Sequence, residues 1–233
     1  MPLLIWICGG GFQVMDRDVW WPQWISFAKR GCIVASVDYR TGNEDKFPAA
    51  LCDIKSAIRY FKENAQLYGI DPERIFVAGE SAGGALASLA GVTSTSEQTK
   101  YDVGSNLHQN SSIKGVIDFY GVVDFVNPEI MLGAGTDLSE GAVNGWLGIE
   151  GNRKGRETEA SAVSHISKDT PPFLIFHGTE DQLVAKGQSD YFYEKLCEMG
   201  VKADYYIAEG EGHGADAFYQ TKIQNIIWDF MNE

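Results

Sequence analysis

The apolar residues of this 233-residue chain form short continuous runs that alternate with longer stretches of helical periodicity. A continuous apolar run is typical of a parallel strand that is covered on both faces of its sheet. The first such run, at 3–8, begins almost at the first residue and leads directly into three glycines. Similar runs predict further strands at 32–40, 74–78, 113–121, 172–181 and 202–210.

Between these runs the apolar residues recur every three or four positions, which predicts amphipathic helices. The longest helix is expected over 47–69, where Leu51, Ile54, Ile58 and Phe61 form one stripe and Gly69 ends the pattern. Other helices are predicted at 16–31, 82–91, 188–200 and 221–233. Strands that alternate with helices predict an α/β fold: a mainly parallel, doubly covered sheet with right-handed crossovers.

Two regions depart from this alternation. Residues 93–112 are polar and loop-like, and residues 122–168 form a long glycine-rich connection with scattered apolar residues. Long connections of this kind are usually lids or binding loops. Because no linker, repeat or low-complexity tract interrupts the chain, we expect a single domain over 1–233.

The charge and the hydropathy exclude two classes of partner. A net charge of −13 without any basic run argues against nucleic acid. The apolar runs are far shorter than the 18 or more residues of a membrane span, and Met1 is followed by a strand pattern rather than a signal segment. We therefore expect no membrane partner, and a cytoplasmic location unless a longer chain carries an upstream signal. The four cysteines are irregularly spaced, which favours reduced, buried thiols over a metal site or disulfides.

The strongest chemical signal is "GESAGG" at 79–84, which lies between a predicted strand and a predicted helix. A sharp turn at this point exposes the hydroxyl of Ser81, and Gly79 and Gly83 remove side chains that would collide in so tight a bend. The N-terminal amides of the following helix favour negative charge at the same place. Ser81 is therefore the candidate nucleophile.

A serine nucleophile needs a base and a carboxylate that orients the base. Of four histidines, His213 has the best chain position, in a glycine-rich turn between the last strand and the last helix. His108 and His165 lie in polar or turn segments, and His177 ends a strand where a structural hydrogen bond is expected. Asp181 follows the strand at 172–181 and is the preferred acid, with its neighbour Glu180 as the competitor. The order serine, acid, histidine is that of one known triad arrangement.

Attack on a carbonyl creates an oxyanion, which needs N–H donors. The backbone amide of Ala82 is one candidate donor, and Gly10 and Gly11 are the others, with Gly9 assigned to the turn itself. Glycines at the end of a strand present bare amides to a ligand. A phosphate-binding loop is the competing interpretation, but the chain lacks the lysine that ends such a loop.

These motifs together resemble the α/β-hydrolase fold, and within it carboxylesterases of the hormone-sensitive-lipase and acetyl-xylan or feruloyl esterase kind. The resemblance covers essentially the whole chain and runs through "PLLIWICGGGF", "VDYR", "VAGESAGG", "PPFLIFHGTEDQLV" and "GEGHG". It implies an acyl-enzyme mechanism with Ser81, Asp181 and His213 as the catalytic triad. It also implies Gly10, Gly11 and Ala82 as the oxyanion hole.

The chain departs from that family in two respects. Cys8 stands where the family keeps a histidine before the glycines, so the bonds that brace this loop must come from elsewhere. Relatives also carry an antiparallel strand pair, and some carry a helical cap, before the first strand seen here. We therefore expect a shortened chain that lacks the usual N-terminal strands, with a sheet edge that favours self-association into a homo-oligomer.

The substrate implied by the resemblance is a small acyl ester, such as an acetyl or feruloyl ester of plant carbohydrate. Trp20 and Trp21 are candidates to line the pocket, since aromatic faces stack on sugar rings, with core packing as the alternative. The loop after the glycines and the 122–168 connection are expected to wall the pocket. No metal or organic cofactor is required by this chemistry. The alternatives are a thioesterase or lipase, a serine peptidase of the prolyl-oligopeptidase kind, and a non-catalytic binding module.

Overall fold

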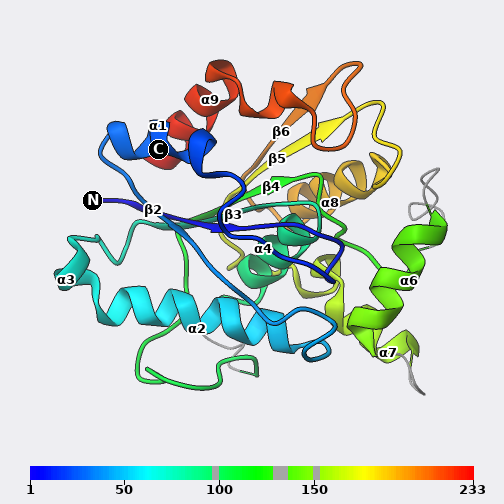
Figure 1. Cartoon of the computed structure of the whole chain (residues 1–233), viewed down its shortest axis with the longest axis horizontal. Helices are drawn as coiled ribbons and strands as arrows, with labels where there is room; N and C mark the ends of the chain where they lie inside the picture. Colours follow the sequence, from blue (N-terminus) through cyan, green and yellow to red (C-terminus); the bar gives the residue numbers. More distant parts are fainter. Residues whose placement is uncertain (96–99, 128–135, 149–152) are drawn as a thin grey trace.

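The computed structural model describes residues 1–95, 100–127, 136–148 and 153–233. Its described strands form one six-stranded sheet in the order β2-β1-β3-β4-β5-β6, and every neighbouring pair is parallel (Figure 1). The strands are β1 (Leu3–Ile7), β2 (Ile33–Ser36), β3 (Ile75–Glu80), β4 (Gly115–Phe119), β5 (Phe173–Gly178) and β6 (Ala203–Ala208). This is the sheet that the apolar runs predict.

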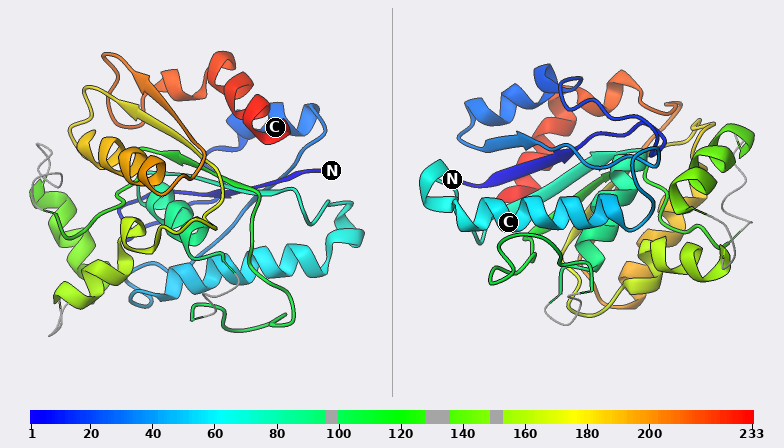
Figure 2. Two further views of the ribbon diagram at one scale, coloured as in Figure 1. Left: turned by 180° about the vertical axis from the view of Figure 1, so that it is seen from behind. Right: turned by 60° about the horizontal axis from the view of Figure 1, so that its bottom comes forward.

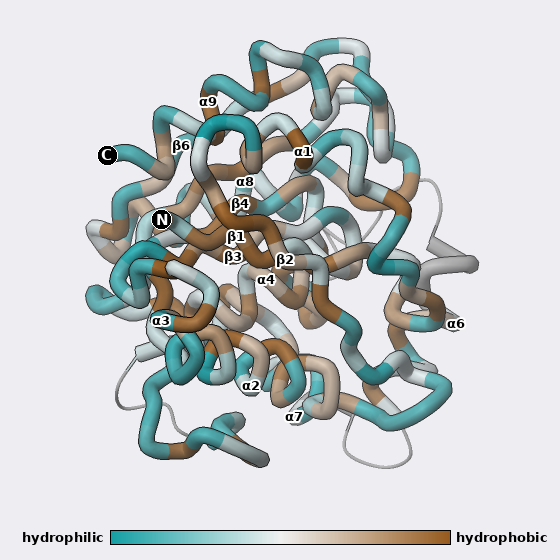
Figure 3. The backbone as a smooth tube through the Cα atoms, turned by 60° about the vertical axis from the view of Figure 1, so that its left-hand side comes forward, coloured by the Kyte–Doolittle hydropathy of each residue, from teal (hydrophilic) through white to brown (hydrophobic). Residues whose placement is uncertain are grey.

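Helices cover both faces of the sheet, as the doubly buried strands require. The views in Figure 2 place α2 and α9 on opposite sides of the strands. One face packs against α2 (Ala49–Glu63), α4 (Ala82–Val92) and α8 (Gly187–Glu198). The other packs against α1 (Trp21–Lys29), η2 (Asp216–Tyr219) and α9 (Thr221–Asn232). The most hydrophobic parts of the backbone are the central strands between these layers (Figure 3).

The element boundaries follow local signals in the sequence. The long helix predicted over 47–69 is interrupted at Asn64, after which the short α3 (Ala65–Tyr68) ends at Gly69 in the left-handed conformation. The strand predicted over 32–40 is shorter than expected, because only Ile33–Ser36 pairs with β1. The chain beyond it leaves the sheet toward α2.

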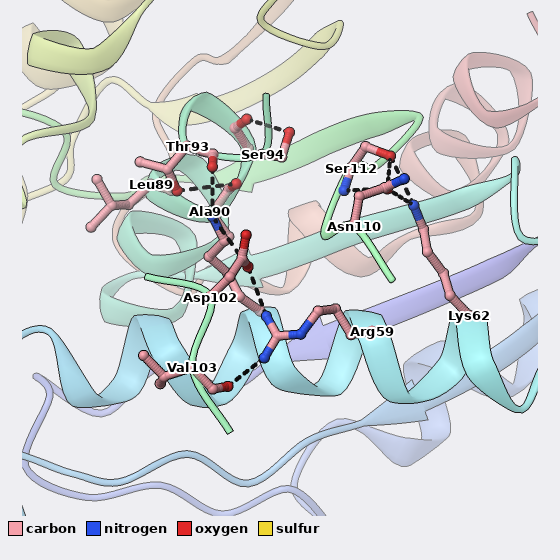
Figure 4. Close-up of polar contacts among 12 residues, drawn as sticks. Arg59, Lys62, Leu89, Ala90, Thr93, Ser94, Asp102, Val103, Asn110 and Ser112 are labelled. Carbon is pink, nitrogen blue, oxygen red and sulfur yellow. Dashed lines mark hydrogen bonds and ion pairs between the residues drawn. The ribbon is translucent and has the colours of Figure 1, made fainter. Parts of the chain in front are cut away.

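The segment at 93–112 contains no helix or strand among its described residues, in agreement with its polar sequence. Buried cations of α2 hold this segment (Figure 4). Arg59, which is wholly buried, pairs with Asp102 at 2.7 Å, and Lys62 donates to Ser112 at 2.8 Å. The loop is therefore anchored by charge, and also by Tyr101, whose buried ring packs in the core against Phe47.

The connection at 122–168 is more helical than predicted. It carries α6 (Thr136–Leu147), α7 (Arg153–Ala160) and the short 3-10 helix η1 (Ala162–His165). The expectation of a loop is therefore wrong for these three segments. Glycines at 141, 145 and 155 favoured a loop over α6 and α7, because glycine is a poor helix former. In Figure 1, α6 and α7 lie beside the sheet rather than on its faces.

The remaining predictions concern edges, thiols and membranes. The outermost strands of the described sheet are β2 and β6, and association through an edge stays a prediction. Three of the four free cysteines are buried, whereas Cys197 is exposed. In the part of the chain that the structure describes, no helix combines the length and the apolar character that crossing a membrane requires.

Candidate active site

The candidate site lies where the parallel strands end at one edge of the sheet. Gly9–Gly11 follow β1, Ser81 follows β3, Asp181 follows β5 and His213 follows β6. Because the carboxyl ends of parallel strands share an edge, residues far apart in the sequence meet there.

Ser81 occupies a sharp turn between β3 and α4, with φ 56° and ψ −121°. Its N–H donates to the carbonyl of Phe119 at 2.9 Å, which fixes the turn to β4. A Cβ at Gly79 would lie 2.3 Å from the carbonyl oxygen of Gly83, and a Cβ at Gly83 would lie 2.1 Å from that of Ile7. The prediction that these two glycines make room for the turn is confirmed.

His213 and Asp181 form a hydrogen-bonded pair, with 2.7 Å between Nδ1 and Oδ2. All four histidines lie in described segments, and two of the other three have no contact with this acid. His108 contacts Glu63 at the surface, and His165 contacts the carbonyl of Glu159. The structure thus pairs the predicted base with the predicted acid, whereas Glu180 is exposed.

The carboxylate of Asp181 is buried and fully engaged. Its Oδ1 accepts the backbone N–H groups of Leu183 and Val184, each at 2.9 Å. Burial alone would raise the pKa of Asp181, but hydrogen bonds and charge from His177 and His213 outweigh burial and hold this pKa well below its usual range. The carboxylate is therefore ionised and orients the imidazole of His213.

His177 contacts Asp181 and the backbone of Val184 from within the core. Its side chain is wholly buried, with Nδ1 2.7 Å from the hydroxyl of Ser189 and Nε2 3.0 Å from the carbonyl of Val184. Its Nε2 also lies 3.4 Å from Oδ2 of Asp181. The structural hydrogen-bonding role predicted for this histidine is confirmed.

Ser81 and His213 line the same cavity, which has a volume of about 200 Å³. Gly11 and Ala82 also line it. The rest of the wall is apolar and comprises Phe12, Val122, Ala142, Val143, Leu183 and Val184. The predicted contributions of the loop after the glycines and of the 122–168 connection are therefore confirmed.

Three backbone amides at this site are available to a ligand. Within the described residues, the N–H groups of Gly10, Gly11 and Ala82 donate to no protein acceptor. Gly10 has φ 132°, and a Cβ there would lie 2.1 Å from the carbonyl oxygen of Val14. The sequence predicts these three amides as the oxyanion-hole donors, and Gly11 and Ala82 also line the cavity beside Ser81.

The glycine loop is braced without a histidine at its start. The hydroxyl of Tyr39 donates to the carbonyl of Cys8 at 2.7 Å, and the N–H of Gly9 donates to the carboxylate of Glu80. The Cys8 sulfur itself lies 3.9 Å from that carboxylate. Burial raises the pKa of Glu80, opposed by the Gly9 N–H and by the charge of His213. The peptide group between Cys8 and Gly9 is therefore held at both its carbonyl and its N–H, without a histidine.

Trp20 and Trp21 do not line the described cavity. Trp20 is half-buried and stacks on Tyr219, with 4.3 Å between ring centroids. Trp21 is 47% exposed, and its indole N–H donates to Asp18. The core-packing alternative describes Trp20, and Trp21 lies at the surface.

Sequence reasoning missed Glu80 and Tyr39. Glu80 lies inside the motif that identified Ser81, and its position beside the nucleophile was the available signal. Tyr39 lies in the motif "VDYR", which was the available signal, but its contact with the Cys8 carbonyl depends on how the chain leaves β2. Among the described residues, no group of three or more histidine, cysteine or acidic side chains is placed to hold a metal ion.

A serine on a sharp turn after a central parallel strand, with an acid and a histidine after later strands, defines the α/β-hydrolase fold. Solved structures agree. A truncated carbohydrate esterase from gut microbiota superposes with a TM-score of 0.85 and 27% identity, over 99% of this chain and 85% of that one. An acetyl ester-xyloside bifunctional hydrolase from Caldicellulosiruptor lactoaceticus superposes with a TM-score of 0.82 and 26% identity, over 100% of this chain and 81% of that one.

The family model BD-FAE matches residues 1–196, so the chain belongs to the BD-FAE family. Esterase LipQ of Mycobacterium tuberculosis is 28% identical over 100% of this chain and 54% of its own length. The chain spans about half the length of the curated relatives it matches first.

Proposed function

We propose that this protein is a serine carboxylesterase that hydrolyses small acyl esters through an acyl-enzyme intermediate. The observation that carries the proposal is the bond of 2.7 Å between His213 and Asp181, with His213 and Ser81 on one cavity. Relatives and structural neighbours named as esterases support the same activity.

In the first step the Ser81 hydroxyl oxygen attacks the ester carbonyl carbon, and its proton passes to Nε2 of His213. Asp181 keeps the Nδ1 proton of the imidazole in place and stabilises the imidazolium. The carbonyl oxygen becomes an oxyanion, which the amides of Gly10, Gly11 and Ala82 stabilise. Collapse breaks the bond to the alcohol, which leaves with the proton from His213.

In the second step a water molecule attacks the acyl-enzyme. His213 takes a proton from the water, and the second tetrahedral intermediate uses the same amides. Its collapse releases the carboxylic acid and returns the proton to Ser81. No step consumes a further reactant.

The substrate we propose is an acetyl or feruloyl ester of plant carbohydrate. The apolar wall supports a short acyl group, since it surrounds Ser81 in a cavity of about 200 Å³. Two neighbours named for carbohydrate or acetyl-ester chemistry support a sugar as the alcohol.

The test is hydrolysis of p-nitrophenyl acetate, acetylated xylo-oligosaccharide and methyl ferulate by the wild type, Ser81→Ala and Ser26→Ala. Ser26 lies on α1 and serves as the matched control. We expect turnover by the wild type and by the control, and none above background by Ser81→Ala. Turnover by a folded Ser81→Ala variant near the wild-type rate would contradict the mechanism. An inactive wild type would contradict the function.

A further inference from the structure

Tyr120 adopts a backbone conformation that is unusual for a large side chain. It directly follows β4, its side chain is wholly buried, and its φ is 45°. A bulky residue in the left-handed region persists only where its surroundings impose it, and such residues gather at functional sites.

Three elements impose this conformation. The N–H of Tyr120 donates to the carbonyl of Phe176 in β5 at 2.8 Å. Its hydroxyl lies 2.7 Å from the hydroxyl of Tyr219 in η2. The next residue, Gly121, fits so closely against α4 that a Cβ would lie 2.6 Å from the amide nitrogen of Ala85. The tyrosine is therefore fixed at both its backbone and its hydroxyl.

The ring that is held in this way lies against the imidazole of His213. The two ring centroids are 4.5 Å apart, and the planes are inclined by 58°. The hydroxyl of Tyr120 contacts that of Tyr219, and the ring of Tyr219 stacks on that of Trp20 with 4.3 Å between centroids. A series of aromatic residues thus connects the residue before α1 with the base.

The loop that carries His213 is anchored both before and after the histidine. Before the histidine, Gly210 donates to the Thr179 hydroxyl at 2.8 Å, and the carbonyl of Glu211 accepts the N–H of Glu180 at 3.0 Å. After it, the chain enters η2, which Tyr120 holds through Tyr219. Tyr120 therefore contacts both the imidazole and the segment that follows it.

We propose that Tyr120 is the positioning residue for His213. Its ring keeps Nδ1 turned toward Asp181, and its π-electrons favour the imidazolium that forms when Ser81 gives up its proton. Among the described residues, the carboxylate of Asp181 lies 2.7 Å from the imidazole, and the charge of His213 acts on the carboxylate of Glu80. This role rests on the proposed function, because it concerns proton transfer during ester hydrolysis.

The test compares Tyr120→Leu, which removes the ring, with Tyr120→Phe, which keeps the ring and loses only the hydroxyl. Active sites are titrated with a fluorophosphonate, so that kcat refers to competent enzyme alone. With p-nitrophenyl acetate, we expect Tyr120→Leu to lower kcat about tenfold and to change KM less than about twofold. Tyr120→Phe should keep at least about half of the wild-type kcat. A purely structural role would lower the amount of competent enzyme and the melting temperature, but not kcat per site.

Two results would overturn the proposal: a titrated Tyr120→Leu variant with wild-type kcat, or an equal loss of kcat in Tyr120→Phe. If Tyr120→Leu does not fold, Tyr120→Met, whose unbranched and flexible side chain adapts to the vacated space without a ring, carries the same expectation and the same refutation. A wild type without esterase activity would instead be a failure of the proposed function, so the two failures are distinguishable.

Discussion

Replacing Asp181 by asparagine changes one acceptor at the centre of the site and little else. The carboxylate receives two backbone N–H groups on Oδ1 and His213 on Oδ2. The amide oxygen of asparagine would replace Oδ1 and accept the two backbone N–H groups. Its NH₂ group would then replace Oδ2 and face Nδ1 of His213. Two donors would then meet unless the imidazole changed its tautomer.

The wrong tautomer leaves Nε2 protonated and unable to accept the proton of Ser81. Loss of this function in a serine triad lowers kcat by up to about 10⁴-fold, which corresponds to about 5.4 kcal/mol in the activation free energy. Since the carboxylate is buried, water cannot readily replace it. We therefore expect Asp181→Asn to lower kcat by about 10³- to 10⁴-fold with a small change in KM.

The assay is steady-state hydrolysis of p-nitrophenyl acetate, with circular dichroism to show that the variant is folded. Glu180→Gln is the matched control, because this neighbouring carboxylate is exposed, and it should keep kcat within about twofold. A folded Asp181→Asn variant that keeps a tenth of the activity would refute the reasoning. So would an equal loss in Glu180→Gln.

Three further predictions concern stability and the glycine loop. Arg59→Met should lower the free energy of unfolding in urea by about 3 kcal/mol, because it breaks a buried ion pair (Figure 4). The exposed control Arg17→Met should lower it by less than about 1 kcal/mol, and similar losses would contradict this account. Tyr39→Phe should lower kcat about fivefold, because the Cys8 carbonyl loses its hydrogen-bond donor. Cys8→Ala should keep kcat within about twofold of the wild type. A larger loss in Cys8→Ala than in Tyr39→Phe would be inconsistent with a loop held through its backbone. Burial raises the pKa of Asp118 from 3.8 to about 6, so the folded state binds the extra proton and stability falls as the pH rises between these values. The unfolding free energy of Asp118→Asn minus that of the wild type should therefore rise by about 2 kcal/mol from pH 4 to pH 7. A pH-independent difference would argue against a charged buried carboxylate.

Much of the fold could be predicted from the sequence because the strands are buried on both faces. A run such as 3–8 has no polar position to accommodate water, so it can only lie inside a covered sheet. Ser81 was predictable because the sharp turn that exposes it has room only for glycine at positions 79 and 83. Asp181 and His213 followed from the edge at which parallel strands end.

The parts that escaped prediction depend on contacts between distant segments. Trp20 is of a residue type that often stacks on sugar rings, but its own ring stacks on Tyr219, nearly 200 positions away along the chain. The role of Tyr120 depends on its φ and on three elements that meet around it. The helices within 122–168 escaped because their glycines, at 141, 145 and 155, suggest a loop.

Labelling with a fluorophosphonate tests the central claim most directly. The wild type, Ser81→Ala and Ser26→Ala are incubated with the reagent, and the modified peptide is identified by mass spectrometry. The account predicts one adduct on Ser81 in the wild type and in the Ser26→Ala control, and none in Ser81→Ala. A folded wild type that stays unmodified, or an adduct that persists in Ser81→Ala, would contradict it.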